Sequence, residues 1–153
     1  MAYWLMKSEP DTYGIDDLIK QGRGMWEGCR NYTVRNFFRD DFQIGDLALF
    51  HHSNSKPSGV IGVMKCVSEP YADPTQFDPE SHYYDPKAPR EGKPRWLVVD
   101  MEFVRKFDRI VSLAELREHP VLKDMWVCRK GQRLSVMPVT EREWETLLGL
   151  PGL

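Results

Sequence analysis

Flat aromatic side chains stand beside small polar or cationic side chains at three places in the sequence. These places are Trp26 with Arg30-Asn31-Tyr32, His51-His52 with Ser53-Asn54, and Arg95 with Trp96. A nucleobase site needs this mixture, because the ring faces stack on aromatic walls while the ring edge needs donors and acceptors at fixed positions. Stacking contributes about 1–3 kcal/mol per base, so two walls could offset the few kcal/mol that extruding a base costs. These segments therefore favour a base-binding pocket.

No catalytic signature accompanies these residues. The chain lacks a Gly-x-Ser-x-Gly elbow, a P-loop and a Gly-x-Gly-x-x-Gly after a predicted strand. His51 and His52 are the nearest approach to a metal-binding pair, but neighbours on a strand point to opposite faces. Glu9, Asp73 and Asp85 are candidates for an acid and base pair, yet no spacing brings two of them together. We therefore expect a binding protein, not an enzyme, without cofactor or metal.

The charge is small overall but segregated along the chain. A net charge of -2 opposes simple nucleic-acid binding, because non-specific affinity comes from Lys and Arg that neutralise phosphates. Locally, residues 23–39 carry four Arg against Glu27 alone, residues 129–133 carry three cations, and residues 69–85 carry five acids without one Lys or Arg. This segregation is compatible with one basic face and equally with an ordinary mixed surface.

The predicted elements alternate irregularly. Apolar or alternating runs predict strands at residues 2–6, 47–52, 59–67, 95–107 and 134–139. Helices are predicted at residues 15–21, 32–40, 113–118 and 140–148, and capping-box pairs open the last two (Ser112 with Glu115, Thr140 with Glu143). The proline-rich residues 69–95 predict one long loop whose aromatic side chains keep it packed. This order predicts an α+β fold on a curled, barrel-like sheet.

Length and cysteine content limit the organisation of the chain. A length of 153 residues predicts a single domain over residues 1–153. Three widely spaced cysteines predict neither a disulfide framework nor a Cys-x-x-Cys motif. Residues 1–6 are too short for a signal peptide, and no stretch approaches the roughly 20 apolar residues of a membrane span. These features predict a cytoplasmic protein that does not enter a membrane.

Several segments, in order and spacing, resemble the EVE domain. They are Tyr3-Trp4-Leu5-Met6-Lys7-Ser8-Glu9-Pro10, Trp26-Glu27-Gly28-Cys29-Arg30-Asn31-Tyr32, Phe50-His51-His52-Ser53-Asn54, Tyr71-Ala72-Asp73-Pro74, Tyr83-Tyr84-Asp85-Pro86, Pro94-Arg95-Trp96 and Arg133-Leu134-Ser135-Val136. The resemblance covers essentially the whole chain. It implies a PUA-like barrel flanked by short helices, with a deep pocket similar to those of the YTH and SRA domains. It also implies a non-catalytic partner of DNA or RNA that carries a modified base, in particular a cytosine derivative.

The resemblance further implies which side chains line the pocket. Carried over position by position, they are Lys7, Ser8, Trp26 as a wall, Asn31, Tyr32, His52, Ser53, Asn54, Asp73, Trp96, Arg133 and Ser135. Of these, Arg133 is the side chain best suited to meet an anion such as a phosphate.

Two other interpretations are compatible with the sequence. In the first, the same pocket binds or hydrolyses a free nucleotide or another small anionic ligand, with Lys7, Asp73 and Arg133 at the site. In the second, the acidic part of the long loop, residues 69–85, binds a partner protein. Marked salt dependence with polymeric nucleic acid would distinguish a base reader from both.

The five tryptophans divide into two groups by their neighbours. Trp4, Trp126 and Trp144 lie in apolar or helix-periodic surroundings and are predicted to be core residues. Trp26 and Trp96 are flanked by charge or glycine, which is about equally compatible with a core ring and with an exposed or half-exposed ring. We therefore expect Trp26→Ala to abolish base binding without unfolding the protein, and Trp144→Ala to destabilise the fold.

Overall fold

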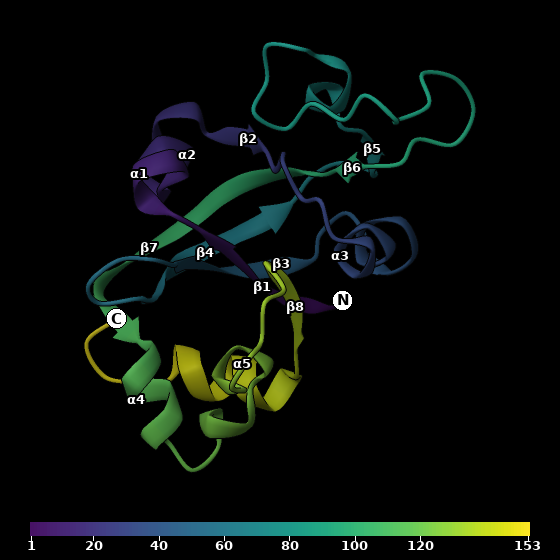
Figure 1. Cartoon of the computed structure of the whole chain (residues 1–153). Coiled ribbons are helices and arrows are strands. Elements are labelled where there is room, and N and C mark those ends of the chain that lie inside the picture. The colour runs from purple at the N-terminus through teal and green to yellow at the C-terminus, as the bar shows by residue number, and fades with distance from the viewer.

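Six strands form one strongly curled sheet in a computed structural model that describes all 153 residues (Figure 1). In spatial order they are β2 (Arg23–Met25), β7 (Asp100–Ser112), β4 (Gly59–Cys66), β3 (Leu47–His52), β1 (Tyr3–Ser8) and β8 (Val136–Val139). The neighbouring strands β1 and β3 are parallel, and every other neighbouring pair is antiparallel. The predicted α+β fold on a curled, barrel-like sheet is confirmed.

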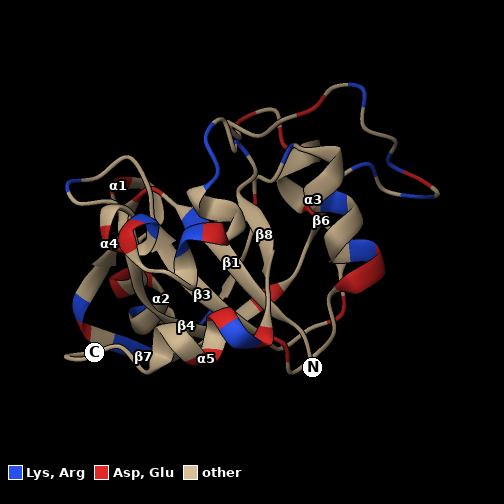
Figure 2. Cartoon of the chain, turned by 90° about the horizontal axis from the view of Figure 1, so that it is seen from below, with Lys and Arg blue, Asp and Glu red and all other residues tan.

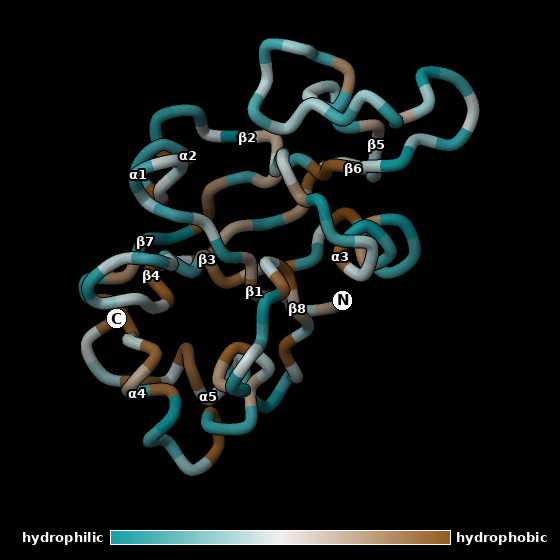
Figure 3. The backbone as a smooth tube through the Cα atoms, viewed as in Figure 1, coloured by the Kyte–Doolittle hydropathy of each residue, from teal (hydrophilic) through white to brown (hydrophobic).

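Helices cover both faces of this sheet, and each face has its own apolar core (Figure 1). Side chains of α2 (Ile15–Gln21) and α3 (Tyr32–Asn36) pack into the first core, with α1 (Pro10–Tyr13) leading into α2. Side chains of α4 (Leu113–Glu118), α5 (Glu141–Leu148) and the 3-10 turns Leu122–Asp124 and Trp126–Cys128 pack into the second. Successive strand residues alternate between the cores. In Figure 3 brown accordingly gathers within the sheet, as along β3 and β4, whereas the long loop is mostly teal or white.

Of the two predicted capping boxes, one forms completely and the other only in part. Thr140 and Glu143 form the complete capping box, with both reciprocal hydrogen bonds present. Ser112 accepts from the Glu115 amide, but the Glu115 carboxylate binds Arg109 instead of the cap, so the second bond is missing. The predicted helix at residues 32–40 has nearly the right length, but its second half is a π-helical turn, Phe37–Asp41.

The predicted strand at residues 95–107 is divided in the structure. Residues Leu97–Val98 form β6, which pairs with β5 (Tyr71–Ala72) in a separate two-stranded sheet before the chain enters β7. Trp96 to Val99 are all buried, so the predicted inside-outside alternation fails here. The reason is that this stretch is covered by protein on both sides, and a run buried on both faces shows no alternation.

Burial of the tryptophans follows the sequence prediction at Trp4 and Trp144 but not at Trp126. Trp4 and Trp144 are core residues as predicted, with exposed fractions of 4% and 5%, whereas Trp126, also predicted to be core, is only half-buried. Trp26 and Trp96, whose burial the sequence left open, are each only 6% exposed. Both are buried because residues distant in sequence, namely α1 and the long loop, pack over segments that look open when read alone.

All three cysteines are buried and free, which agrees with the prediction of no disulfide framework. None of the helices combines the length and the apolar composition that crossing a membrane would require.

Candidate functional site

A cavity of about 720 Å³ opens where the ends of β1 and β8 meet α1, the segment after β2, and the long loop. This volume is within the range of about 300–1,000 Å³ that is usual for ligand pockets. Aromatic, neutral polar, cationic and anionic side chains surround the cavity. The lining residues are Lys7, Ser8, Glu9, Thr12, Tyr13, Gln21, Met25, Trp26, Glu27, Gly28, Cys29, Ser53, His82, Tyr83, Arg133, Leu134 and Ser135.

Two aromatic rings form walls of the cavity. Trp26 is held edge-on by Phe50 and Tyr13, with ring centroids 5.4 and 6.1 Å away, and no protein group accepts a hydrogen bond from its indole N–H. Tyr83, from the long loop, lies directly over Gly28. A Cβ at Gly28 would stand 2.5 Å from the Tyr83 ring, and the Gly28 φ of +83° is in the left-handed region that favours glycine. Gly28 therefore allows the loop to close over the cavity.

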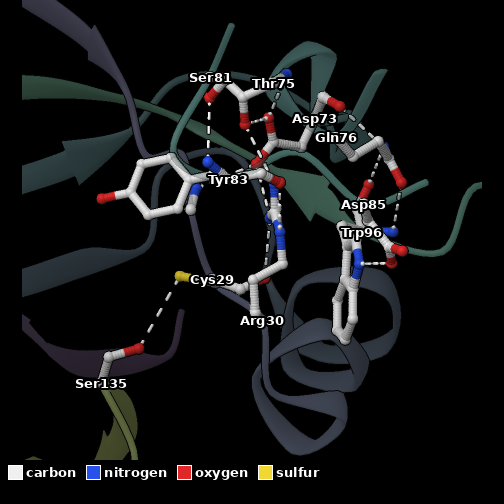
Figure 4. Close-up of polar contacts among 11 residues, drawn as sticks. Cys29, Arg30, Asp73, Thr75, Gln76, Ser81, Tyr83, Asp85, Trp96 and Ser135 are labelled. Atoms are coloured by element: carbon white, nitrogen blue, oxygen red, sulfur yellow. Dashed lines mark hydrogen bonds and ion pairs between the residues drawn. The ribbon is translucent and has the colours of Figure 1, made fainter. Parts of the chain in front are cut away.

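An ion pair anchors the long loop to the segment after β2 (Figure 4). Asp73 is fully buried and accepts from the Gly28 amide at 3.0 Å and from Arg30 Nη1 at 2.9 Å. Arg30 also donates to the Tyr83 carbonyl from Nε and Nη2, and to the Thr75 hydroxyl. One guanidinium thus joins both ends of the loop segment that carries Tyr83, and this contact sets the position of the Tyr83 wall.

A second group of hydrogen bonds fixes the return of the loop (Figure 4). The Trp96 indole N–H donates to Asp85 at 2.8 Å, and the Gln76 side chain bonds both the amide and the carbonyl of Trp96. The Asp85 amide in turn donates to the Gln76 carbonyl at 2.9 Å. The predicted packed character of residues 69–95 has its physical basis in these contacts.

Burial changes the ionisation of several groups around the cavity. It lowers the pKa of Lys7 and raises that of Glu27, which the negative charge of Asp73 raises further and Arg30 opposes. It also raises the pKa of the Cys29 thiol to about 11. Cys29 therefore stays protonated at neutral pH, 3.8 Å from the Ser135 hydroxyl, and does not supply the thiolate that a cysteine nucleophile requires.

The structure brings half of the predicted site residues together in this cavity. Six of them line it: Lys7, Ser8, Trp26, Ser53, Arg133 and Ser135. Their contact with a base stays a prediction. Sequence reasoning did not select His82 and Tyr83 because their loop is far from the other lining residues in sequence. The signal was present, since Tyr83 belongs to one of the segments that carry the EVE resemblance.

Asn31 and Tyr32 lie outside the cavity. The Asn31 side chain caps α3 by accepting from the amides of Thr33 and Val34, at 2.8 and 3.3 Å. Tyr32 is 53% exposed and packs on Trp96, with ring centroids 4.9 Å apart. The start of α3 turns these two side chains away from Trp26.

His52 and Asn54 also lie outside the cavity but support residues around it. His52 Nε2 accepts from the Ile15 amide at 3.2 Å and so holds the start of α2. Asn54 donates to the Glu9 carboxylate at 2.6 Å. Because Glu9 lines the cavity, Asn54 acts on it through Glu9.

Asp73 and Trp96 lie behind the Tyr83 wall and not in the cavity. The Arg30 guanidinium stands between the two rings, 5.6 Å from the centroid of Tyr83 and 5.6 Å from that of Trp96. The alternative site of Lys7, Asp73 and Arg133 is therefore not assembled, because Asp73 is taken up by Arg30 and Gly28.

We expect Gly28→Ala to weaken ligand binding in this cavity and to destabilise the fold. The left-handed backbone conformation costs a non-glycine residue about 1–2 kcal/mol, and the new methyl group must displace the Tyr83 ring. Gly45→Ala is the matched control, because Gly45 has a φ of +98° but no atom near its Cβ position. Urea denaturation should show a lower free energy of unfolding in both variants, whereas only Gly28→Ala should lose ligand binding. Unchanged binding in Gly28→Ala would contradict the role of Tyr83 as a wall.

We also expect stability to fall in mild acid because of His51. This side chain is 1% exposed, and neither ring nitrogen has a partner. Its pKa is lowered from 6.5 to about 4, first by burial and then by the charges of Lys7 and His52. Between pH 6.5 and pH 4 the unfolded chain binds a proton that the folded chain does not. The free energy of unfolding therefore decreases by up to about 3 kcal/mol as the pH is lowered through this range. Urea midpoints from pH 7 to pH 4 should fall less in His51→Leu; an identical fall would contradict this account.

Comparison with known proteins places this fold and cavity in context. A family model described as the EVE domain matches residues 2–150. Thymocyte nuclear protein 1 of Danio rerio is 43% identical over 166 residues, which cover 96% of this chain and 71% of that protein. Its Homo sapiens counterpart is 40% identical over 168 residues, which cover 97% and 73%.

Solved structures agree with this relationship. A crystal structure of a Pseudomonas syringae protein has a TM-score of 0.91 at 45% identity and covers 96% of this chain and 97% of that one. The human THYN1 protein, crystallised in complex with 5-methylcytosine-containing DNA, has a TM-score of 0.89 at 39% identity, with coverage of 97% and 96%. An ASCH protein from Zymomonas mobilis, at 10% identity and a TM-score of 0.53, shares the fold alone.

One sequence prediction is wrong on this comparison, namely the cytoplasmic location. The relatives from zebrafish, human and mouse are all named as nuclear proteins. The prediction failed because the absence of a membrane-spanning segment does not distinguish one aqueous compartment from another. The match over residues 2–150, together with relatives above 30% identity along nearly the whole chain, shows that this protein belongs to the EVE domain family.

Proposed function

We propose that this protein binds a nucleic-acid strand by taking one modified base, a cytosine derivative, into the 720 Å³ cavity between Trp26 and Tyr83. The observation that carries the proposal is the combination of two aromatic walls with polar side chains of both signs around one opening. The rings can stack on the base faces, while carboxylate, hydroxyl and ammonium groups can meet its edge.

The polar groups around the cavity suit a cytosine derivative. The Glu27 side chain makes no hydrogen bond or ion pair within the protein, so its carboxylate is available to accept from an exocyclic amino group such as N4 of cytosine. Ser8, Ser53 and Ser135 add hydroxyls that can donate or accept. Lys7 and Arg133 supply the cations for the phosphate of the same nucleotide.

The human THYN1 complex supports the choice of partner. That protein was crystallised with DNA containing 5-methylcytosine, and it matches nearly the whole of this chain at 39% identity. We extend this ligand class to the present protein because both chains share the fold over their full overlap, and because the cavity provides the stacking surfaces that the ligand requires.

The function that we propose is binding without catalysis. The Cys29 thiol, with its pKa of about 11, is not a nucleophile at neutral pH. Nor does any group of three or more His, Cys, Asp or Glu side chains lie close enough together to hold a metal ion. The other side chains of the cavity suit a protein that recognises a base by its shape and by hydrogen bonds to its edge.

Fluorescence polarisation with short DNA and RNA oligonucleotides tests this function. The oligonucleotides carry unmodified cytosine, 5-methylcytosine, 5-hydroxymethylcytosine or N6-methyladenine at one position. We expect a cytosine derivative to bind best, with a preference near fourfold if a buried methyl group contributes only about 0.8 kcal/mol. Equal binding of all four would show that the cavity does not read the modification.

Tyr83→Ala and Tyr84→Ala form a matched pair for the same assay. Tyr83 lines the cavity, whereas its neighbour Tyr84 is 40% exposed and does not. Loss of one stacking surface, worth about 1–3 kcal/mol, should weaken binding by Tyr83→Ala roughly 5- to 150-fold and leave binding by Tyr84→Ala unchanged. The Arg30 contacts should persist, because they reach the main-chain carbonyl of residue 83. Equal affinities in the two variants would refute stacking in this cavity.

A further inference from the structure

A second cavity, of about 530 Å³, lies on the other side of Trp96 and contains cations but no acids. It is formed by α3, the turn Phe37–Asp41, and the two ends of the long loop. Figure 2 shows Lys and Arg on α3 and on the long loop. The lining residues are Tyr32, Arg35, Arg39, Pro70, Tyr71, Ala72, Pro89, Lys93, Pro94, Arg95 and Leu97. We call this cavity the basic groove.

The cations of the basic groove are only partly neutralised within the protein. Arg39 pairs with Asp40 at 2.8 Å, and Arg95 pairs with Asp85 at 3.4 Å. Arg35 donates hydrogen bonds only to the neutral amide of Asn36 and forms no ion pair, and the Lys93 side chain makes neither an ion pair nor a hydrogen bond. The groove therefore retains the positive charge of at least these two side chains, in a protein whose net charge is -2.

An unbroken row of stacked side chains joins the basic groove to the wall of the first cavity. Arg30 lies between Tyr83 and Trp96, and Trp96 packs on Tyr32 at 4.9 Å. The Arg35 guanidinium completes the row, 4.8 Å from the Tyr32 centroid. The two cavities are therefore separated by this row of side chains, whose neighbours stand 4.8–5.6 Å apart, so both lie within the span of a short oligonucleotide.

The lining of the basic groove suits a sugar-phosphate backbone better than a second base. Proline rings and Leu97 offer apolar surface for sugar faces, while Arg and Lys at the edges can meet phosphates. Its two exposed rings are both engaged within the protein. Tyr32, 53% exposed, has Trp96 and Arg35 packed against it, and the hydroxyl of Tyr71, 40% exposed, donates to Asp100 at 2.6 Å. The absence of any acidic side chain from the groove lining also suits a polyanion that spans several cations.

We propose that the basic groove binds the phosphodiester backbone of the nucleic-acid strand whose base occupies the first cavity. This inference rests on the proposed function and adds to it a second contact that reads no sequence. Such contacts fix the position of a strand, and base contacts provide selectivity. The groove thus makes the protein bind a modified base within a chain more tightly than the free modified nucleoside.

The test compares two variants that remove the same charge. Arg35→Gln with Lys93→Gln removes the unpaired cations of the groove, and Lys123→Gln with Arg142→Gln removes one Lys and one Arg from the opposite face, where neither makes an ion pair. Both proteins are titrated with a 12-nucleotide single strand carrying 5-methylcytosine, with the unmodified strand, and with free 5-methylcytidine monophosphate, at several salt concentrations.

We expect the groove variant to bind both strands roughly tenfold more weakly at 0.1 M salt, with a salt slope reduced by about 1.4 for two lost phosphate contacts. Its affinity for the mononucleotide should stay unchanged, and the control variant should match the wild type. Equal salt slopes in the two variants would contradict backbone binding by the groove but not base binding in the first cavity. If the wild type failed to bind the mononucleotide but bound the strands, base binding in the first cavity would be contradicted instead. If the wild type bound neither ligand, both proposals would be contradicted.

Discussion

Trp26→Ala is expected to lower the free energy of unfolding by about 3–5 kcal/mol, as much as truncation of a tryptophan in the centre of the core. Trp26 is 6% exposed and Trp144 is 5% exposed, so both substitutions leave large voids among packed aromatic side chains. Around Trp26 the void would lie between Phe50 and Tyr13. Urea denaturation followed by circular dichroism measures the loss. This result replaces the expectation, drawn from the sequence, that Trp26→Ala spares the fold.

Trp26 therefore has two roles, and a second substitution is needed to separate them. Trp26→Phe keeps an aromatic wall and most of the buried area, so it should cost less stability than Trp26→Ala and retain measurable binding. Trp144→Ala, in the other core, should lose stability to the same degree but keep its base affinity in the fraction that remains folded. If Trp26→Ala proved as stable as the wild type, the ring would belong to the ligand site alone.

Arg30→Ala is expected to open the long loop by removing the partner of a buried carboxylate. Asp73 is fully buried and Arg30 is 22% exposed, and a buried charge left without its partner costs about 3–5 kcal/mol. The same substitution removes the donors to the Tyr83 carbonyl, so the wall over Gly28 should be lost and base binding with it. Amide hydrogen exchange should show faster exchange at the Gly28 and Thr75 amides, both of which donate to Asp73.

Arg39→Ala serves as the control for this experiment. Arg39 and Asp40 also form an ion pair, at 2.8 Å, but their side chains are 50% and 53% exposed. Water screens such a pair, so its removal should leave hydrogen exchange in the long loop unchanged. Similar exchange in Arg30→Ala and Arg39→Ala would show that the loop is held by packing and not by the ion pair.

Local elements were the easiest features to predict from the sequence. The strand Leu47–His52 and the helices Ile15–Gln21 and Leu113–Glu118 were predicted at their observed bounds, because alternation, capping residues and Gly22 act over a few neighbouring positions. The π-helical turn at Phe37–Asp41 was not predicted, since its register follows from packing of Phe38 and Phe42 in the core. The division of the strand near Val99 was missed for the same reason.

The cavity lining was predictable where its residues lie on the curled sheet, as Lys7 and Ser8 do, or next to it, as Ser135 and Trp26 do. The sequence by itself determined the fold class, the family resemblance and the chemical character of the proposed base-binding site. Only the tertiary structure decided that Tyr83 is a wall, that Asp73 and Trp96 stand behind it, and that Tyr32 faces a separate basic groove. The physical reason is that one half-buried guanidinium, that of Arg30, bonds residues more than 40 positions away along the chain. Such a contact leaves no local pattern in the sequence.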